Sequence, residues 1–170
     1  MNSAELHKLF SSVREGDKES FALIYNDMKK PVFTVAYRIL NSRELAEDVT
    51  HDVFVKLFVS PPDISVTNPR AWVFTCTRNM AIDILRKTQC RDLDEVTSEA
   101  KDDFSDLETR IDVESAISKL SLEEREIVTL HVNAGLTLSE TAKITGLSLP
   151  AVYRRYSKAL KILRKFMNGE

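Results

Sequence analysis

An acidic segment near the middle of the chain limits how this sequence can fold more than any other feature does. Residues 91–112 contain nine Asp and Glu residues against three Lys and Arg. Such a segment repels itself and has few apolar side chains to offset the entropy lost on ordering, so it is poorly suited to a packed core. We therefore interpret residues 91–111 as a flexible acidic linker and expect two small domains, residues 1–90 and residues 112–170.

The composition on either side of this segment favours helices. Only 4 Gly and 5 Pro occur among 170 residues, and Val, Ile and Thr do not alternate between turn signals as they would in a sandwich or barrel. No apolar run approaches the roughly 18 to 20 residues of a membrane helix, and Met1–Phe10 carries charges where a signal peptide is apolar. Cys76 and Cys90 lack the spacing of a metal or redox site. We expect an all-α, cytoplasmic protein with no metal and no cofactor.

Capping residues and apolar spacing predict where the N-terminal helices lie. Asn2 or Ser3 caps a first helix, Asn41-Ser42 offers a cap for another, and Asn68-Pro69 combines a cap with a proline at the first helical position. Helices are expected from about residue 3 to Gly16, over residues 17–29, from Pro31 onward, from Ser42 to about Val59, and over residues 70–88.

The helix that ends near Val59 has two unlike faces when it is projected at 100° per residue. Leu45, Ala46, Val49, Val53, Phe54 and Leu57 form an apolar arc. Glu44, Asp48, His51, Asp52 and Val55 form the other arc. Periodicity alone favours an ordinary solvated surface for this second arc.

The helix over residues 70–88 carries an unusual set of side chains opposite its apolar arc. Trp72, Thr75, Asn79, Ile82, Asp83 and Arg86 fall within about 100° of one another. A single-stranded nucleic acid could use a ring to stack on, polar groups for base edges and a cation for phosphate. Packing of Trp72 against a neighbouring helix, with the rest exposed to solvent, explains the residues equally well.

The C-terminal part has the layout of a helix-turn-helix. Ser121 with Glu124 and Thr137 with Glu140 are capping boxes, each at the start of a helix. The second of these helices is short and ends at Gly146, after which Ser148 caps the last helix. Two capped helices joined by so short a turn are typical of a DNA-binding helix-turn-helix.

The last helix indicates what this motif binds. Between Tyr153 and Lys165 there are six cations and no acid, so the basic face should seek phosphates; a merely solvated basic face is the alternative. Projection places Leu149, Val152, Tyr156, Ala159, Leu160, Leu163 and Phe166 on an apolar arc. It places Pro150, Ala151, Arg154, Arg155, Lys158, Lys161 and Lys165 on the opposite one.

Three stretches together resemble a known family. Residues 46–56 look like region 2.2 of the extracytoplasmic-function (ECF) sigma factors of bacterial RNA polymerase, residues 68–86 like regions 2.3 and 2.4, and residues 135–148 with the basic helix like region 4.2. The resemblance covers nearly the whole chain in the order of the family. It implies a sigma factor that binds core RNA polymerase and directs promoter recognition and DNA opening.

The resemblance also implies a role for each surface. The clamp helices of the largest polymerase subunit are expected to bind Asp48, His51, Asp52 and Val55. The minus 10 element is expected at Trp72, Thr75, Asn79 and Arg86, with an extruded base read by the loop over residues 60–67. The minus 35 element is expected at Ser148, Pro150, Ala151, Arg154, Arg155 and Lys158. An anti-sigma factor is expected as a further partner, and no small-molecule substrate is expected.

Two departures from the family limit what can be transferred. His51 stands where Gln is usual, and Tyr153-Arg-Arg-Tyr156 replaces a more usual Lys-Ser-Arg-Leu pattern. Base preference at the minus 35 element therefore cannot be carried over.

Two other functions compete with a sigma factor as explanations of the sequence. A helix-turn-helix regulator with an N-terminal protein-interaction domain is the alternative from the same broad class, although residues 1–90 lack the strand pattern of a receiver domain. An enzyme is disfavoured because the chain has no Gly-rich phosphate loop, no GxSxG and no HExxH.

Overall fold

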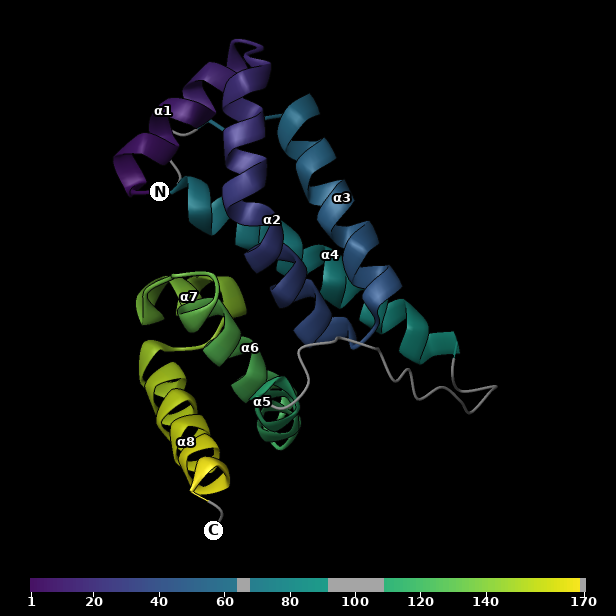
Figure 1. Cartoon of the computed structure of the whole chain (residues 1–170), viewed down its shortest axis with the longest axis vertical. Helices are drawn as coiled ribbons and strands as arrows, with labels where there is room; N and C mark the ends of the chain where they lie inside the picture. Colours follow the sequence, from purple (N-terminus) through teal and green to yellow (C-terminus); the bar gives the residue numbers. More distant parts are fainter. Residues whose placement is uncertain (64–67, 92–108, 169–170) are drawn as a thin grey trace. The chain divides into compact units, whose positions relative to one another are not determined.

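The computed structural model describes residues 1–63, 68–91 and 109–168 and is all-α in these ranges (Figure 1), which confirms the predicted fold class. The chain divides into two compact units at residue 96. That division falls inside the predicted acidic linker, residues 91–111, nearly all of which lies outside the described residues. The helices of the first unit are α1 (Ser3–Arg14), α2 (Lys18–Leu40), α3 (Arg43–Val59) and α4 (Pro69–Arg91). Those of the second are α5 (Thr109–Ser118), α6 (Leu122–Val132), α7 (Leu138–Thr145) and α8 (Leu149–Met167).

The predicted caps begin the helices of the first unit. Asn2 forms a capping box with Glu5, in which each side chain accepts the backbone N–H of the other residue, at 2.8 and 2.9 Å. The side chain of Ser42 accepts the N–H of Leu45 at the start of α3, and Asn68 Oδ1 accepts the N–H of Arg70 at the start of α4. These bonds satisfy donors that have no partner inside the helix.

The prediction of separate helices before and after Pro31 is wrong. Residues 18–40 form one helix, α2, with Pro31 inside it. A proline in a helix interior removes a backbone hydrogen bond and costs about 3 kcal/mol. Ile24, Met28 and Val32 continue one buried stripe across the proline, and this burial against α3 and α4 offsets the lost bond.

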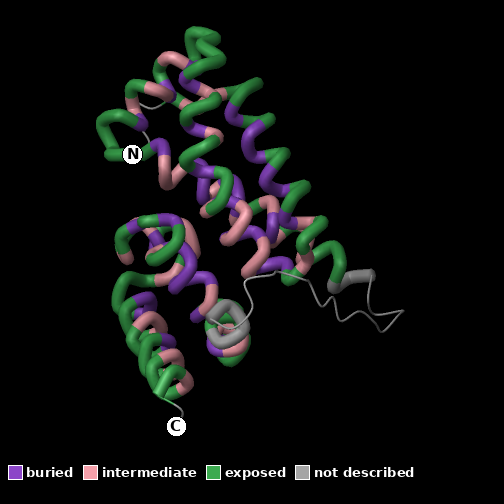
Figure 2. Tube along the Cα trace, viewed as in Figure 1, coloured by how far each residue is buried: buried purple, intermediate pink, exposed green. Residues whose placement is uncertain are grey.

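Apolar faces of α1, α2, α3 and α4 form the core of the first unit, and buried and exposed positions alternate along α3 (Figure 2). An aromatic group joins α2 to α3: the rings of Tyr25 and Phe54 lie 4.8 Å apart and those of Phe21 and Phe58 lie 5.1 Å apart, both edge-on. Edge-to-face pairs of this kind add about 1 kcal/mol to the burial of their area. The core side of α3 is thereby held against α2.

The start of α4 is also held by charge. The guanidinium of Arg70 lies 3.4 Å from the carboxylate of Asp27 on α2, which is in turn 3.7 Å from the amino terminus of Met1. These ion pairs are partly exposed and each contributes little free energy. These ion pairs help to fix the position of the start of α4, since they join it to α2 and to the amino terminus of the chain.

In the second unit, α7 and α8 form the predicted helix-turn-helix. Thr137 and Glu140 make the capping box of α7, and Ser148 caps α8. Gly146, at φ 73°, ends α7 in the left-handed region, which a glycine adopts without strain. Tyr156 of α8 packs against the buried cluster of Ile127, Ala142 and Val152 and lies edge-on to His131 with the ring centroids 5.0 Å apart.

Two neighbouring residues of α2 test this packing. Ile24 is fully buried, whereas Leu23 is 56% exposed. Ile24→Ala should lower the free energy of unfolding of the first unit by about 2 to 5 kcal/mol because it leaves a cavity. Leu23→Ala, the matched control, should change it by less than about 0.5 kcal/mol. Urea unfolding followed by the fluorescence of Trp72 measures both, and equal effects would contradict the packing described here.

Candidate protein and nucleic-acid interfaces

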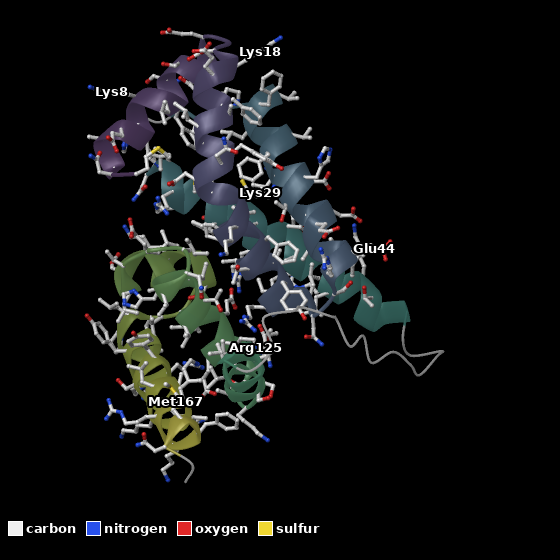
Figure 3. All side chains as sticks on the ribbon, viewed as in Figure 1. Lys8, Lys18, Lys29, Glu44, Arg125 and Met167 are labelled. Carbon is white, nitrogen blue, oxygen red and sulfur yellow. The ribbon has the colours of Figure 1, made fainter. Side chains whose placement is uncertain are left out.

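The second arc of α3 is an exposed surface. Asp48, His51, Asp52 and Val55 are all exposed, and the opposite side of the helix carries the buried residues Ala46, Val49, Thr50, Val53, Phe54 and Leu57. Because the core anchors one side along the full length of α3, the other side is presented as a continuous face. Glu44 lies on the same face in the first turn (Figure 3).

Two features make this α3 face suited to binding a protein. Within the described part of the chain, neither Asp48 nor Asp52 forms a hydrogen bond or ion pair, so both charges are uncompensated. Phe58 and Val59, three and four residues after Val55, are also exposed, Val59 at 75%. The sequence analysis did not include these two residues, although their helical spacing from Val55 was sufficient to find them.

The predicted nucleic-acid arc of α4 is graded in exposure. Trp72 and Thr75 are half-buried, whereas Asn79 and Arg86 are exposed. The hydroxyl of Thr75 donates to the carbonyl oxygen of Ala71 at 2.7 Å, which leaves its oxygen able to accept but not to donate. The arc therefore presents a ring edge, an acceptor, an amide and a cation in succession along the helix.

The core side of α4 carries Cys76, which is buried. Burial raises the pKa of this thiol, against an opposing effect of nearby Lys56. The thiol therefore stays neutral, which is the less reactive form. The side chain of Cys90 lies outside the described residues.

The helical projection of α8 was wrong at three positions. Ala151 is only 8% exposed, whereas the projection placed it on the polar arc, and Leu149 and Leu160 are exposed although the projection placed them on the apolar arc. The small side chains of Ala151 and Ala159 let α8 approach the helices it packs against. The side of α8 that carries Ala151 and Ala159 therefore faces the neighbouring helices, and Leu149 and Leu160 are left exposed.

The predicted minus 35 residues now fall into three groups. Ser148, Pro150 and Arg154 are exposed, and Ala151 is buried. Arg155 and Lys158 are paired with α6: Arg155 Nε lies 2.6 Å from Glu123 Oε2, and Lys158 Nζ lies 2.8 Å from Glu124 Oε1. Sequence reasoning missed these pairs because the acids precede the cations by more than 30 residues and carry a capping signal of their own.

Glu124 has a double role. It is 4% exposed, and its carboxylate accepts the N–H of Ser121 at 3.0 Å through one oxygen while the other oxygen faces Lys158. The hydrogen bond from Lys158 holds the pKa of this carboxyl below its usual value, with a further contribution from the bonds to Ser121. One charge thus caps α6 and ties it to the middle of α8.

Arg154 differs from its neighbours on α8. It lines a shallow cleft of about 360 Å³ with Ser121, Glu123, Glu124, Arg155 and Lys158. Unlike Arg155 and Lys158, it makes no ion pair with any residue that the structure describes. Its guanidinium is therefore available to an external acceptor.

None of the helices in the described ranges is long and apolar enough to cross a membrane. The same ranges contain no group of three or more His, Cys, Asp or Glu side chains arranged to hold a metal ion.

The two units correspond to two described regions of one family. Sigma-70 region 2 matches residues 24–91, and Sigma-70, region 4 matches residues 110–163. The matches together span more than half of the chain, in the order expected from the resemblance. The protein is thus a member of the sigma-70 family.

Curated relatives define the class more narrowly. The chain is 25% identical to the ECF RNA polymerase sigma factor SigK of Mycolicibacterium vanbaalenii, over 96% of this chain and 89% of that protein. It is 23% identical to the ECF RNA polymerase sigma factor SigW of Bacillus subtilis, over 94% of this chain and 95% of that protein. These full-length similarities place it in the ECF class.

Solved structures share the fold. The sigma factor RpoE, solved with the anti-sigma factor NepR from Bartonella quintana, has a TM-score of 0.71 at 22% identity, over 88% of this chain and 98% of that chain. CnrH, solved with the cytosolic domain of CnrY, has a TM-score of 0.68 at 21% identity, over 98% of this chain and 99% of that one.

The pair between Glu124 and Lys158 predicts a dependence of stability on pH. The pKa of Glu124 is lowered from 4.5 in the folded state. The ionised carboxylate therefore contributes fully to the stability of the second unit above pH 4.5. This contribution is lost as the pH falls through the lower pKa of the folded state. Glu124→Gln should cost the second unit about 1 kcal/mol at pH 7. The difference from the wild type should vanish in acid.

Urea titrations followed through amide NMR signals of α6 and α8 measure this difference at each pH. Glu123→Gln is the control, because Glu123 is exposed and its side chain takes no part in the cap. A similar dependence on pH in both variants would contradict the role assigned to Glu124.

Proposed function

We propose that this ECF sigma factor binds core RNA polymerase through the α3 face, opens promoter DNA with α4 and reads the upstream promoter element with α8. The observation that carries the proposal is that each surface has exposed side chains able to meet a partner: Asp48 and Asp52 on α3, Asn79 and Arg86 on α4, and Arg154 on α8. These residues fall within the stretches that match Sigma-70 region 2 and Sigma-70, region 4. The chain would act in the cytoplasm as an initiation factor with no catalytic activity of its own.

The α3 face fits a basic helical partner. Asp48 and Asp52, one turn apart, carry charges that no described side chain compensates, and His51 and Val55 lie beside them. Charge complementarity would orient the clamp helices of the largest polymerase subunit, and the exposed Phe58 and Val59 would add apolar contact.

The α4 arc fits a strand separated from its complement. A base could stack on the half-buried ring of Trp72 while Asn79 bonds a base edge and Arg86 neutralises a phosphate. Thr75 would contribute an acceptor. The loop over residues 60–67, which we expect to read an extruded base, lies largely outside the described residues.

The exposed side of α8 fits the major groove of a duplex. A recognition helix enters the groove with its N-terminal residues first, so Ser148, Pro150 and Arg154 would approach the bases. Arg155 and Lys158 would meet phosphates while they remain bonded to α6, since the side chain of Lys158 is still largely exposed. Ala151 is buried and is not retained in this interface.

A further partner follows from the solved relatives. RpoE was solved with the anti-sigma factor NepR, and we propose that this chain is likewise inhibited by an anti-sigma protein that covers its polymerase-binding and DNA-binding surfaces. The partner itself is not identified by any residue described here.

Transcription in vitro tests the function directly. The full chain, mixed with purified core polymerase and genomic DNA, should produce transcripts from a limited set of start sites that core polymerase alone does not use. Failure to confer specific initiation would contradict the proposal and would favour the alternative, a helix-turn-helix regulator that acts on polymerase already carrying another sigma factor.

The α3 face generates a prediction about affinity. Replacing Asp48 and Asp52 together with Lys reverses the charge presented to a basic partner and should weaken binding to core polymerase at least tenfold. Because both side chains are exposed, helicity should be unchanged. Glu15→Lys with Glu19→Lys, at the exposed junction of α1 and α2, is the matched control, and fluorescence anisotropy of labelled protein measures both.

The α8 surface generates a prediction about specificity. Arg154→Ala should cost about 1 to 3 kcal/mol of promoter binding and relax preference at particular upstream positions, because a bidentate contact to a base, preferably guanine, is lost. Lys158→Ala should weaken binding to all sequences alike. It should lower the slope of the logarithm of the binding constant against the logarithm of the salt concentration by roughly one or less, since Glu124 already neutralises part of the charge of Lys158. Binding to a library of upstream elements measures both, and a uniform loss for Arg154→Ala would refute its assignment to bases.

A further inference from the structure

Tyr153 is the one large side chain near the start of α8 whose exposure the fold does not explain. It is 54% exposed, although Val152 beside it is fully buried. Tyr156, three residues on, belongs to both apolar clusters of the second unit and touches His131. Of these two tyrosines, Tyr156 holds the unit together and Tyr153 is left facing outward.

The surroundings of Tyr153 are those of a ligand surface. Its ring forms one wall of a shallow groove of about 390 Å³ whose other walls are Arg154, Ser157, Lys158 and Lys161. All five side chains carry a polar group at their ends, and three of them, Arg154, Lys158 and Lys161, are cations. A polyanion held by the cations would therefore meet one aromatic surface, that of Tyr153.

The position in the helix indicates which part of DNA this ring would meet. Tyr153 lies little more than one turn after the cap Ser148 and directly precedes Arg154, in the part of a recognition helix that approaches base edges. In the major groove the feature that an apolar surface can distinguish is the C5-methyl group of thymine. A ring edge beside an arginine thus suits a thymine next to a base that the arginine bonds.

The ion pairs of α6 strengthen this assignment. Glu123 holds Arg155 and Glu124 holds Lys158, so these two side chains are directed toward α6. Tyr153 and Arg154 make no such contact with the described residues. They are therefore two adjacent side chains near the start of α8 that can adjust to a base.

We propose that Tyr153 is a specificity-determining residue that recognises a thymine methyl group in the upstream promoter element. This inference rests on the proposed function and names a preference that the resemblance cannot supply, because Tyr153 lies in the segment where the chain departs from the family pattern.

Deoxyuridine substitution tests the proposal, because it removes the methyl group and leaves base pairing unchanged. The probe is a promoter fragment mapped by the transcription experiment above, with each upstream thymine replaced singly by uracil, and binding of the full chain with core polymerase is measured. At one position the wild type should lose about fourfold in affinity, the effect of one methyl group that is no longer buried. Tyr153→Phe should show the same loss.

Tyr153→Ala should bind the thymine and uracil fragments equally. Met167→Ala is the matched control, since Met167 is 80% exposed at the far end of the same helix (Figure 3) and should leave discrimination intact. The proposal would be overturned if Tyr153→Ala still distinguished thymine from uracil as the wild type does, or if Tyr153→Phe no longer did. It would also be overturned if the wild type lost affinity at none of the substituted thymines. A wild type that forms no promoter-specific complex would instead show that the proposed function is wrong.

Discussion

The carboxylate of Glu124 joins the start of α6 to the middle of α8. A buried carboxylate is stable as an ion only when hydrogen bonds replace its hydration. Ser121 and Lys158 supply those bonds, one from the helix that Glu124 caps and the other from α8. Local folding of α6 and placement of the recognition helix are therefore coupled through one charge.

This coupling changes what the basic face of α8 can do. Six cations on one helix would repel each other and would bind any polyanion with little discrimination. Glu123 and Glu124 compensate two of them in the middle of the helix. The four cations left without an ion pair among the described residues are Arg154, near the start of α8, and Lys161, Arg164 and Lys165, toward its end. The acids of α6 thereby lower the attraction of the middle of the helix for any polyanion.

Local signals made most of the fold predictable, and long-range contacts account for the errors. Capping boxes such as Ser121 with Glu124 involve residues three apart, so the sequence alone shows them. The predicted break at Pro31 was wrong because α2 is stabilised there by burial against other helices, and the spacing of its own residues does not reveal those contacts. The exposed arc of α3 followed from periodicity, whereas the partners of Arg155 and Lys158 come from a different helix and leave no signal in the spacing of α8.

The α3 face and the basic side of α8 differ in how their charges are paired, and the difference matches their proposed partners. On α3, Asp48 and Asp52 have no compensating cation in the described part of the chain, so the face keeps a long-range field that can steer a basic protein partner. On α8, compensation is built in at Arg155 and Lys158, because a duplex is already attracted by its own charge density and further attraction would not distinguish promoters from other DNA. Specificity there has to come from short-range contacts, which is the role that an exposed ring at Tyr153 and an unpaired guanidinium at Arg154 can perform.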